Sequence, residues 1–445
     1  MTNPLAGLPA VHRLLAEEHL RQARERYGPA TVRAAVREVL AEARRRVGQG
    51  EPTPAPPALV AEARALLARR EAAAYPEVLN ATGVLIHTNL GRAPRLAADV
   101  SGYLALEYDL GAGARGERLA PVVGRLTRYF GAEAATVVTN NAAALVLLLA
   151  AHAAGREVIV SRGELVEIGG SFRLPEIMAA AGARLVEVGC TNRTRTEDYA
   201  RAVGDDTAGI LVVHRSNFHL EGFVATPELR DLVELAHARG VPLWVDEGSG
   251  CHLDLSRYGL RREPTVQEIL ATGVDAVLFS GDKLLAGPQA GVLLGSRTTI
   301  APLRNHPLRR ALRPDKSALV VLATTLDAYL AERPETVPLY RLLALPESGL
   351  RTRARRLAGT LRAAGVPAEV VATRAVLGGG TTPDQTLASW GVALAGGDAT
   401  AASLRRATPP VIGRVDDDRV VLDLRAVPAE HDRTLRRALV EALRS

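Results

Sequence analysis

The chain almost lacks lysine. Of its 55 basic residues only Lys283 and Lys316 are lysines, and all the others are arginines. An amine can lose its proton and condense with an aldehyde, whereas a guanidinium group cannot, so a lysine kept against this bias is a candidate for imine chemistry. Lys283 comes just after the apolar run 274–279 and a small polar turn, as expected of a reactive lysine at the end of a buried strand. Lys316 lies in a polar Arg-Pro-Asp-Lys turn and is interpreted as a surface residue, and that plain interpretation also stays open for Lys283.

Cysteines and long apolar segments are also scarce. Two cysteines, Cys190 and Cys251, are too few for a disulfide framework, which favours a reducing compartment. No Cys/His cluster has the spacing of a zinc site, so no metal is expected. The longest apolar stretch, residues 142–151, is half a membrane span, and no secretory apolar region stands near the N-terminus. These features predict a cytoplasmic protein without a membrane partner.

Aromatic residues make up only 4% of the chain, so alanine, leucine and valine must supply most of the core. A length of 445 residues predicts two or three domains. The net charge is +6, and residues 1–71 hold +4 of it, with 12 arginines against 8 glutamates. A basic N-terminal region permits an acidic partner such as RNA.

Residues 1–75 are predicted to form a small, basic, helical module. A leucine pattern marks a first helix, and a second helix is predicted over 29–48, from a proline at its start to a glycine at its end. The Pro-rich segment 49–57 is interpreted as a stiff linker, and a third helix is predicted over 58–73.

Residues 76–330 alternate between short β-rich runs and helical stretches, which predicts an α/β domain with a mostly parallel, seven-stranded sheet and helices on both faces. The seven runs are 135–138, 157–160, 184–188, 208–214, 241–245, 274–279 and 291–294. Residues 331–445 are predicted to form an α+β domain. Its expected elements are a helix near 347–364, strands near 367–372, 385–394, 410–415 and 419–424, and a terminal helix over 429–444.

Polar residues follow several of the predicted strands, where open α/β sheets bind their ligands. After the first strand, Asn141 is predicted to cap a helix, whose free backbone N–H groups at Ala142 and Ala143 would bind an anion. Asp246 ends another buried strand, and a carboxylate there can hold a pyridinium nitrogen protonated. The simpler alternatives are an ordinary capped helix and an aspartate that caps the next turn.

Two further strand ends carry Asn217 and the pair Ser280 and Lys283. Ser280 is placed to hydrogen-bond a phosphate, and Asn217 to reach a ring hydroxyl. An anion cup, a strand-end aspartate and a Ser-x-x-Lys segment, in this order, are typical of pyridoxal 5′-phosphate (PLP) enzymes with the aminotransferase-like fold, called fold type I.

A competing motif, G-x-G-x-x-G at residues 111–116, is typical of dinucleotide-binding loops when it follows an apolar strand. Here it follows the short polar segment 106–110, so dinucleotide binding is not favoured. The segment is better interpreted as a loop that carries Arg115 and Arg118 towards the active site.

Three arginines stand at unusual positions. Arg92 follows a tight Asn-Leu-Gly turn, and Arg310 and Arg313 lie three residues apart on a short, proline-bounded helix, so that they share a face. Paired guanidinium groups suit a phosphate-like anion, although a solvated basic helix would have the same spacing.

Four stretches, at 80–94, 161–173, 280–292 and 306–316, closely resemble bacterial selenocysteine synthases, the L-seryl-tRNA(Sec) selenium transferase family. The resemblance covers nearly the whole chain. It implies a PLP enzyme of fold type I, with Lys283 as the Schiff-base lysine and with the three arginines above as ligands of the selenium donor, selenophosphate. It also implies that the N-terminal module contacts tRNA(Sec) and that dimers assemble into a homodecameric ring.

The implied reaction converts seryl-tRNA(Sec) to selenocysteinyl-tRNA(Sec). The α-proton of the serine is lost to the Lys283 amine, hydroxide leaves the β-carbon, and selenium adds there. One alternative is a PLP-dependent lyase acting on a small amino acid or amino sugar, which would have no use for a basic module at 1–75. Another is an RNA-binding protein without catalysis, which the presence of Lys283 and Asp246 opposes.

The chain departs from the family pattern at a few positions. The loop 109–118 lacks the acidic residue and the lysine expected near 111–114, which leaves the contacts of this loop open. Thr139 replaces a common asparagine, and Arg215 and Phe218 replace a threonine and a tyrosine. These last changes are conservative enough to keep the cofactor assignment.

Overall fold

The computed structural model describes residues 7–71, 75–169 and 172–444, and the chain divides into two compact units, 1–77 and 78–445. Within the described residues, no helix is both long and apolar enough to cross a membrane.

The first unit is a four-helix module whose helices share one apolar core. Its helices are α1 (Val11–Ala16), α2 (Glu18–Tyr27), α3 (Pro29–Gly48) and α4 (Pro56–Glu71). The single first helix predicted from the sequence is wrong, because the extended backbone of Glu17 separates α1 from α2. Residues 29–48 form α3 as predicted.

The Pro-rich segment does not separate the helical module from the rest of the chain. It joins α3 to α4, whose side chains pack in the same core, and Pro56 and Pro57 are themselves the first residues of α4. Proline is tolerated there because the first helical N–H groups have no intrahelical acceptor. The predicted stiff linker is therefore a connection inside the first unit.

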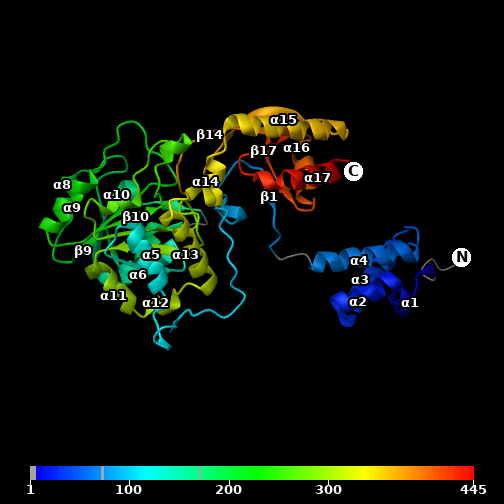
Figure 1. Ribbon diagram of the computed structural model, residues 1–445, viewed down its shortest axis with the longest axis horizontal. Coiled ribbons are helices and arrows are strands. Elements are labelled where there is room, and N and C mark those ends of the chain that lie inside the picture. Colours follow the sequence, from blue (N-terminus) through cyan, green and yellow to red (C-terminus); the bar gives the residue numbers. More distant parts are fainter. Residues whose placement is uncertain (1–6, 72–74, 170–171, 445) are drawn as a thin grey trace. The chain divides into compact units, whose positions relative to one another are not determined.

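The second unit contains the predicted α/β sheet (Figure 1). Its strand order is β4-β12-β11-β10-β9-β5-β8, and all neighbours are parallel except β12, which runs antiparallel between β4 and β11. The predicted fold class and all seven strands are confirmed. Their bounds are β4 (Ala134–Val138), β5 (Glu157–Ser161), β8 (Arg184–Val188), β9 (Thr207–Val213), β10 (Leu243–Gly248), β11 (Ala276–Ser280) and β12 (Gly291–Gly295).

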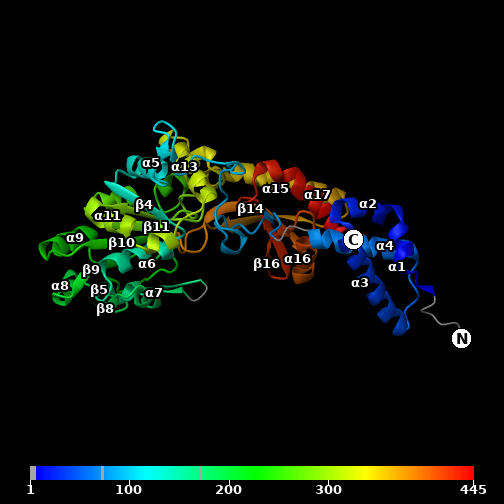
Figure 2. The same cartoon turned by 90° about the horizontal axis from the view of Figure 1, so that it is seen from below.

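Helices cover both faces of this sheet, because alternate strand residues point to opposite sides. In β11, Val277 and Phe279 belong to one apolar cluster, whereas Ala276 and Leu278 belong to another. Figure 2 shows α5 and α13 on one side of the sheet and α6 and α7 on the other. The helices packed on the sheet include α5 (Ala120–Phe130), α6 (Asn141–His152), α7 (Leu174–Ala180), α8 (Thr196–Ala202), α9 (Leu229–Ala238), α10 (Val266–Leu270) and α11 (Arg297–Asn305), and α13 (Lys316–Leu330) packs against α5.

The C-terminal part has its own antiparallel sheet, of order β13-β14-β17-β16, and a third apolar cluster. Its strands are β13 (Glu369–Ala375), β14 (Leu387–Ala395), β16 (Arg414–Asp416) and β17 (Arg419–Asp423), and its helices are α15 (Glu347–Ala363), α16 (Gly397–Arg405) and α17 (Asp432–Leu443). The sequence did not predict α16. A short strand β1 (Leu79–Asn80) pairs in parallel with β15 (Val411–Ile412). This pairing connects the first residues of the second unit to its C-terminal part.

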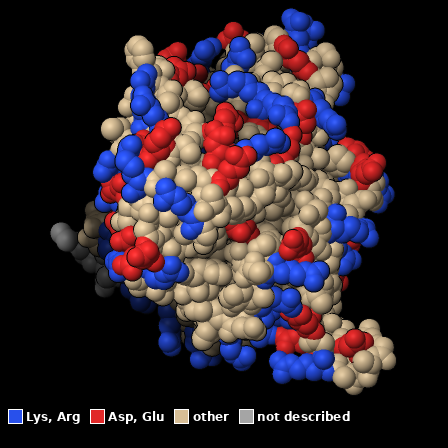
Figure 3. Space-filling view, turned by 90° about the vertical axis from the view of Figure 1, so that its left-hand side faces the viewer, with Lys and Arg blue, Asp and Glu red and all other residues tan. Residues whose placement is uncertain are grey.

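Charged side chains of both signs are intermixed over the face of the molecule seen in Figure 3. Sites where one sign dominates must therefore be identified from individual residues and not from the overall charge.

Candidate active site

A cavity of about 240 Å³ opens at the carboxyl ends of the parallel strands. The segments after β4, β9, β10 and β11 meet there, as expected for an open α/β sheet. Six of its lining residues are Arg92, Asn141, Ala142, Asp246, Ser280 and Lys283, all of which are candidates from the sequence.

Lys283 is buried, with 4% of its surface exposed. Burial and, next, the nearby Arg92 lower the pKa of its amine, while Asp246, Glu247 and Asp282 act in the opposite direction. A lowered pKa increases the share of neutral amine, which is the form that attacks an aldehyde or accepts a proton.

The backbone approaches the Lys283 amine closely at Gly380, a residue that the sequence analysis did not identify. A Cβ atom at this position would lie 2.8 Å from Lys283 Nζ, and the φ angle of Gly380 is +77°. This conformation favours glycine, and a larger residue here would displace the Lys283 amine. The run of three glycines at 378–380 was the signal in the sequence.

Asp246 lies near the end of β10, and a hydrogen bond links its side chain to the first turn of α6. Asn141 Nδ2 donates a hydrogen bond to Asp246 Oδ1 at 2.8 Å. Burial raises the pKa of the Asp246 carboxyl to about 6, against the opposing effects of Asn141 and Lys283. A protonated ring nitrogen placed beside this carboxylate would stabilise its charged form.

The predicted helix cap is wrong by one residue. Asn140 has extended backbone angles, and its side chain accepts a hydrogen bond from the N–H of Ala143, so Asn140 is the N-cap of α6. Asn141 is the first helical residue, which leaves its side chain free to reach Asp246. The Ala143 N–H already donates to the Asn140 side chain. An anion at this helix end would therefore bind to the backbone N–H groups of Asn141 and Ala142.

Asn217 does not line the cavity, since its Nδ2 atom donates to the backbone oxygen of Glu167 at 2.7 Å. Its neighbour Ser216 lines the cavity instead, together with His214. Both residues were missed, although they follow the same predicted strand.

Asp282 was also missed. It precedes Lys283 and lies 3.4 Å from Arg92, which turns into the cavity from a left-handed backbone conformation with φ of +67°. Burial raises the pKa of Asp282, while Arg92 lowers it.

The cavity contains polar atoms without partners, and these suit a bound PLP. Asn141 Oδ1 and His214 Nδ1 are buried without a hydrogen bond in the described part of the chain. The α6 N-terminus and Ser280 provide donors for a phosphate, Asp246 a carboxylate for a ring nitrogen, and Lys283 an amine for an aldehyde. The residues present therefore fit this cofactor.

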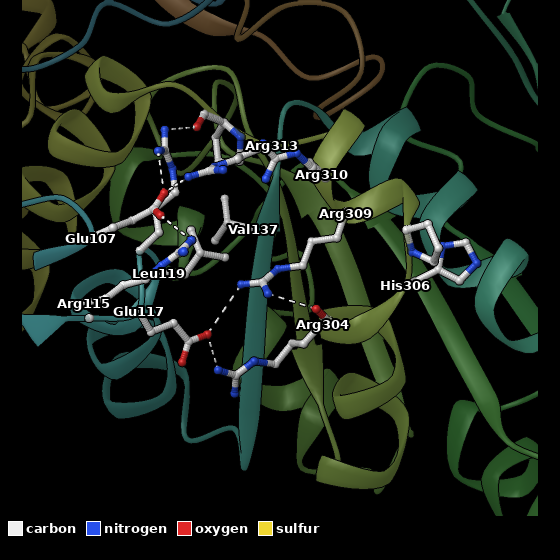
Figure 4. A pocket seen from close by; sticks show the side chains of 14 residues that line it. Glu107, Arg115, Glu117, Leu119, Val137, Arg304, His306, Arg309, Arg310 and Arg313 are labelled. Atoms are coloured by element: carbon white, nitrogen blue, oxygen red, sulfur yellow. Dashed lines mark hydrogen bonds and ion pairs between the residues drawn. The ribbon is translucent and has the colours of Figure 1, made fainter.

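Arg310 and Arg313 line a different and larger cavity, of about 750 Å³ (Figure 4). Arg115 and Arg118 line it too, so the loop that departs from the family pattern reaches these arginines. The three arginines predicted to act together are thus divided, because Arg92 lines the smaller cavity.

The two cavities are neighbours on either side of the connection between β4 and α6. Val137 in β4 lines the larger cavity, and Asn140 at the start of α6 lines the smaller one. Between them, the backbone N–H of Thr139 donates to the carbonyl of Leu312 at 3.0 Å. This bond attaches the segment with Arg310 and Arg313 to the turn that leads into the anion site.

Comparison with known proteins gives one consistent family. Residues 78–428 match the family model of L-seryl-tRNA selenium transferase, and residues 5–44 match that of the selenocysteine synthase N-terminal region. The chain is 48% identical over 383 residues to the L-seryl-tRNA(Sec) selenium transferase of Moorella thermoacetica, covering 82% of this chain and 81% of that protein. It is 42% identical over 380 residues to the enzyme of the same name from Aquifex aeolicus, covering 82% and 84%.

Among solved structures, D-glucosaminate-6-phosphate ammonia-lyase has a similar fold. The TM-score is 0.58 at 20% sequence identity, over 83% of this chain and 96% of that one. At this identity the similarity concerns the fold alone.

Proposed function

The chain belongs to the L-seryl-tRNA(Sec) selenium transferase family, and from this premise we propose which of its residues carry out the reaction. It is a PLP-dependent enzyme that converts seryl-tRNA(Sec) to selenocysteinyl-tRNA(Sec). The buried Lys283 amine, in a cavity also lined by Asp246 and by the start of α6, is the observation that supports the smaller cavity as the active site.

PLP, when bound, withdraws electrons and so eases loss of the α-proton of the seryl group. We propose that Asn141, Ala142 and Ser280 bind its phosphate. Asp246 keeps the ring nitrogen protonated, and Asn141 orients the Asp246 carboxylate through their hydrogen bond. The neutral Lys283 Nζ accepts the α-proton, since its lowered pKa favours the unprotonated amine.

The experiment that tests this function is an assay of the aminoacyl group. The PLP-loaded protein is incubated with seryl-tRNA(Sec) and a selenium donor, and the amino acid released from the RNA is identified. Selenocysteine is the expected product. Unchanged serine would refute the function.

We propose selenophosphate as the donor, with Arg310 and Arg313 binding its phosphate-like end and Arg92 acting from the neighbouring cavity. Two properties support this: six of the residues lining the larger cavity are arginines and only two are acidic, and among the described residues Arg310 has no ion pair. The excess positive charge suits a small oxyanion.

We expect Arg310→Ala and Arg313→Ala to leave PLP bound but to slow selenium transfer. Each charge-assisted hydrogen bond contributes roughly 1.5–3 kcal/mol, so each substitution should cost about tenfold or more in kcat/KM for the donor. Steady-state rates at subsaturating selenophosphate measure this. Arg297→Ala, which removes an exposed arginine from α11 outside the cavity, is the matched control. Full activity of both variants would contradict the proposed donor site.

We further propose that the helical module, residues 1–75, binds tRNA(Sec). On α3, Arg33, Arg37 and Arg44 are exposed, and within the described part of the chain they form no ion pair. Deleting residues 1–75 is therefore expected to leave a PLP-loaded core that binds tRNA(Sec) weakly. Filter-binding titrations of both proteins at two salt concentrations measure this, and the affinity of the full chain should fall with salt as counterions are released. Equal affinities would assign the module to assembly or stability instead.

The small-molecule lyase alternative is less well supported. The ammonia-lyase shares the fold at 20% identity, whereas the match at residues 5–44 is to a selenocysteine synthase region. We also propose a cytoplasmic location, since Cys190 and Cys251 are free thiols. A homodecamer built from dimers is the proposed assembly, and light scattering of the purified protein tests it.

A further inference from the structure

One carboxylate lies among the arginines of the larger cavity. Glu107 Oε1 contacts Arg118 at 3.2 Å and forms an ion pair with Arg313, and Glu107 Oε2 contacts Arg115 at 3.2 Å. Figure 4 shows Arg115 and Arg313 reaching Glu107, with Arg310 close to Arg313. A single carboxylate therefore neutralises one of three positive charges.

The second acidic residue of the cavity has different partners. Glu117 forms ion pairs with Arg304 and Arg309 and with neither Arg310 nor Arg313. Glu107 is thus the acidic residue in contact with an arginine of the proposed donor site.

We propose that Glu107 is a resident counter-ion that occupies the anion position and must be displaced when the selenium donor binds. This inference rests on the proposed role of the larger cavity. The two carboxylate oxygens bind guanidinium groups in the way that two oxygens of a phosphate-like group would. The Glu107 side chain is 26% exposed, so it can leave these partners for solvent without being buried unpaired.

Such a counter-ion lowers the affinity of every competing anion and so decides which anions can occupy the site. A singly charged anion gains about as much from the three arginines as Glu107 does, so it displaces Glu107 poorly. A doubly charged tetrahedral oxyanion, with more charge and more acceptor oxygens, gains more. At comparable concentrations, phosphate-like dianions would then occupy the site, whereas chloride and small carboxylates would leave Glu107 in place.

The test is calorimetric titration of the PLP-loaded full-length protein with inorganic phosphate and, separately, with acetate. Glu107→Gln removes the charge, and Glu107→Asp keeps it but withdraws it from the guanidinium groups. We expect Glu107→Gln to bind phosphate about threefold to tenfold more tightly, the range expected from losing partly exposed ion pairs. Glu107→Asp should shift affinity in the same direction by less. In Glu107→Gln, acetate should gain by about the same factor as phosphate, because neither anion has to displace Glu107 in this variant.

Glu117→Gln is the matched control, because it removes the same charge from the same cavity without freeing Arg313. A much smaller gain is expected for it. The inference is overturned if Glu107→Gln leaves phosphate affinity unchanged or weaker, if Glu117→Gln tightens binding equally, or if phosphate binds to none of the proteins. Tighter binding in Glu107→Gln, together with full selenium transfer by Arg310→Ala and Arg313→Ala, would keep the inference and refute the proposed donor role.

Discussion

Replacing Lys283 by alanine is expected to abolish turnover, by roughly 10³-fold or more, on the scale of losing a general base. No other lysine can substitute for it, because the only other one, Lys316, is bound to the backbone oxygen of Gly102 at 2.9 Å. The buried position of Lys283 and the lowered pKa of its amine are the physical reasons to expect it to be reactive. Rates of selenocysteinyl-tRNA formation measure the loss.

Lys316→Arg is the matched control and should be nearly silent, because a guanidinium group can still donate to the Gly102 oxygen. A second measurement does not depend on activity. Borohydride reduction of the PLP-loaded protein followed by peptide mapping should locate the reduced cofactor on the peptide that contains Lys283. A label on Lys316 would refute the proposed active site.

Asp246→Asn is expected to lower turnover by about 10²–10³-fold while PLP stays bound. Asparagine keeps the shape and the contact with Asn141, but it removes the charge opposite the ring nitrogen. Breaking a buried charge pair by removing one partner costs about 3–5 kcal/mol, and here the cost would fall on the protonated ring. Single-turnover exchange of the seryl α-proton with solvent isolates this step.

Asp254→Asn provides the control for this substitution. Asp254 caps a short 3₁₀ helix outside the cavity through a hydrogen bond from the Ser256 N–H, and asparagine caps about as well. It should therefore leave α-proton exchange unchanged. A normal exchange rate in Asp246→Asn would show that Asp246 does not act on the cofactor.

The strands were predictable because each of the seven is a short β-rich run and helical stretches lie between most of them, as is typical of a sheet covered on both faces. The same difference between β-rich runs and helical stretches predicted the elements of the C-terminal α+β part, except for α16. Helix boundaries were harder. Glu17 interrupts the first helix through its extended backbone, and no proline or glycine stands there to indicate the break.

Adjacent asparagines illustrate the limit at the site. Asn140 and Asn141 are both good caps by residue type, and the choice depends on the backbone angles of Asn140. The partner of Asn141, the Asp246 carboxylate, is 105 residues away in the chain. Local preference cannot distinguish these positions, but the hydrogen bond between the start of α6 and Asp246 in β10 does.

The sequence by itself predicted the fold class and singled out Lys283 and Asp246 as site candidates, because each of these predictions depends on residue type and on position at the end of an apolar run. Tertiary structure alone decided which side chains share a cavity. It placed Gly380 against the Lys283 amine, separated Arg92 from Arg310 and Arg313, and brought Glu107 to Arg313. These contacts join residues that are far apart in the chain, and only the packing of the elements that carry them sets the distances between them.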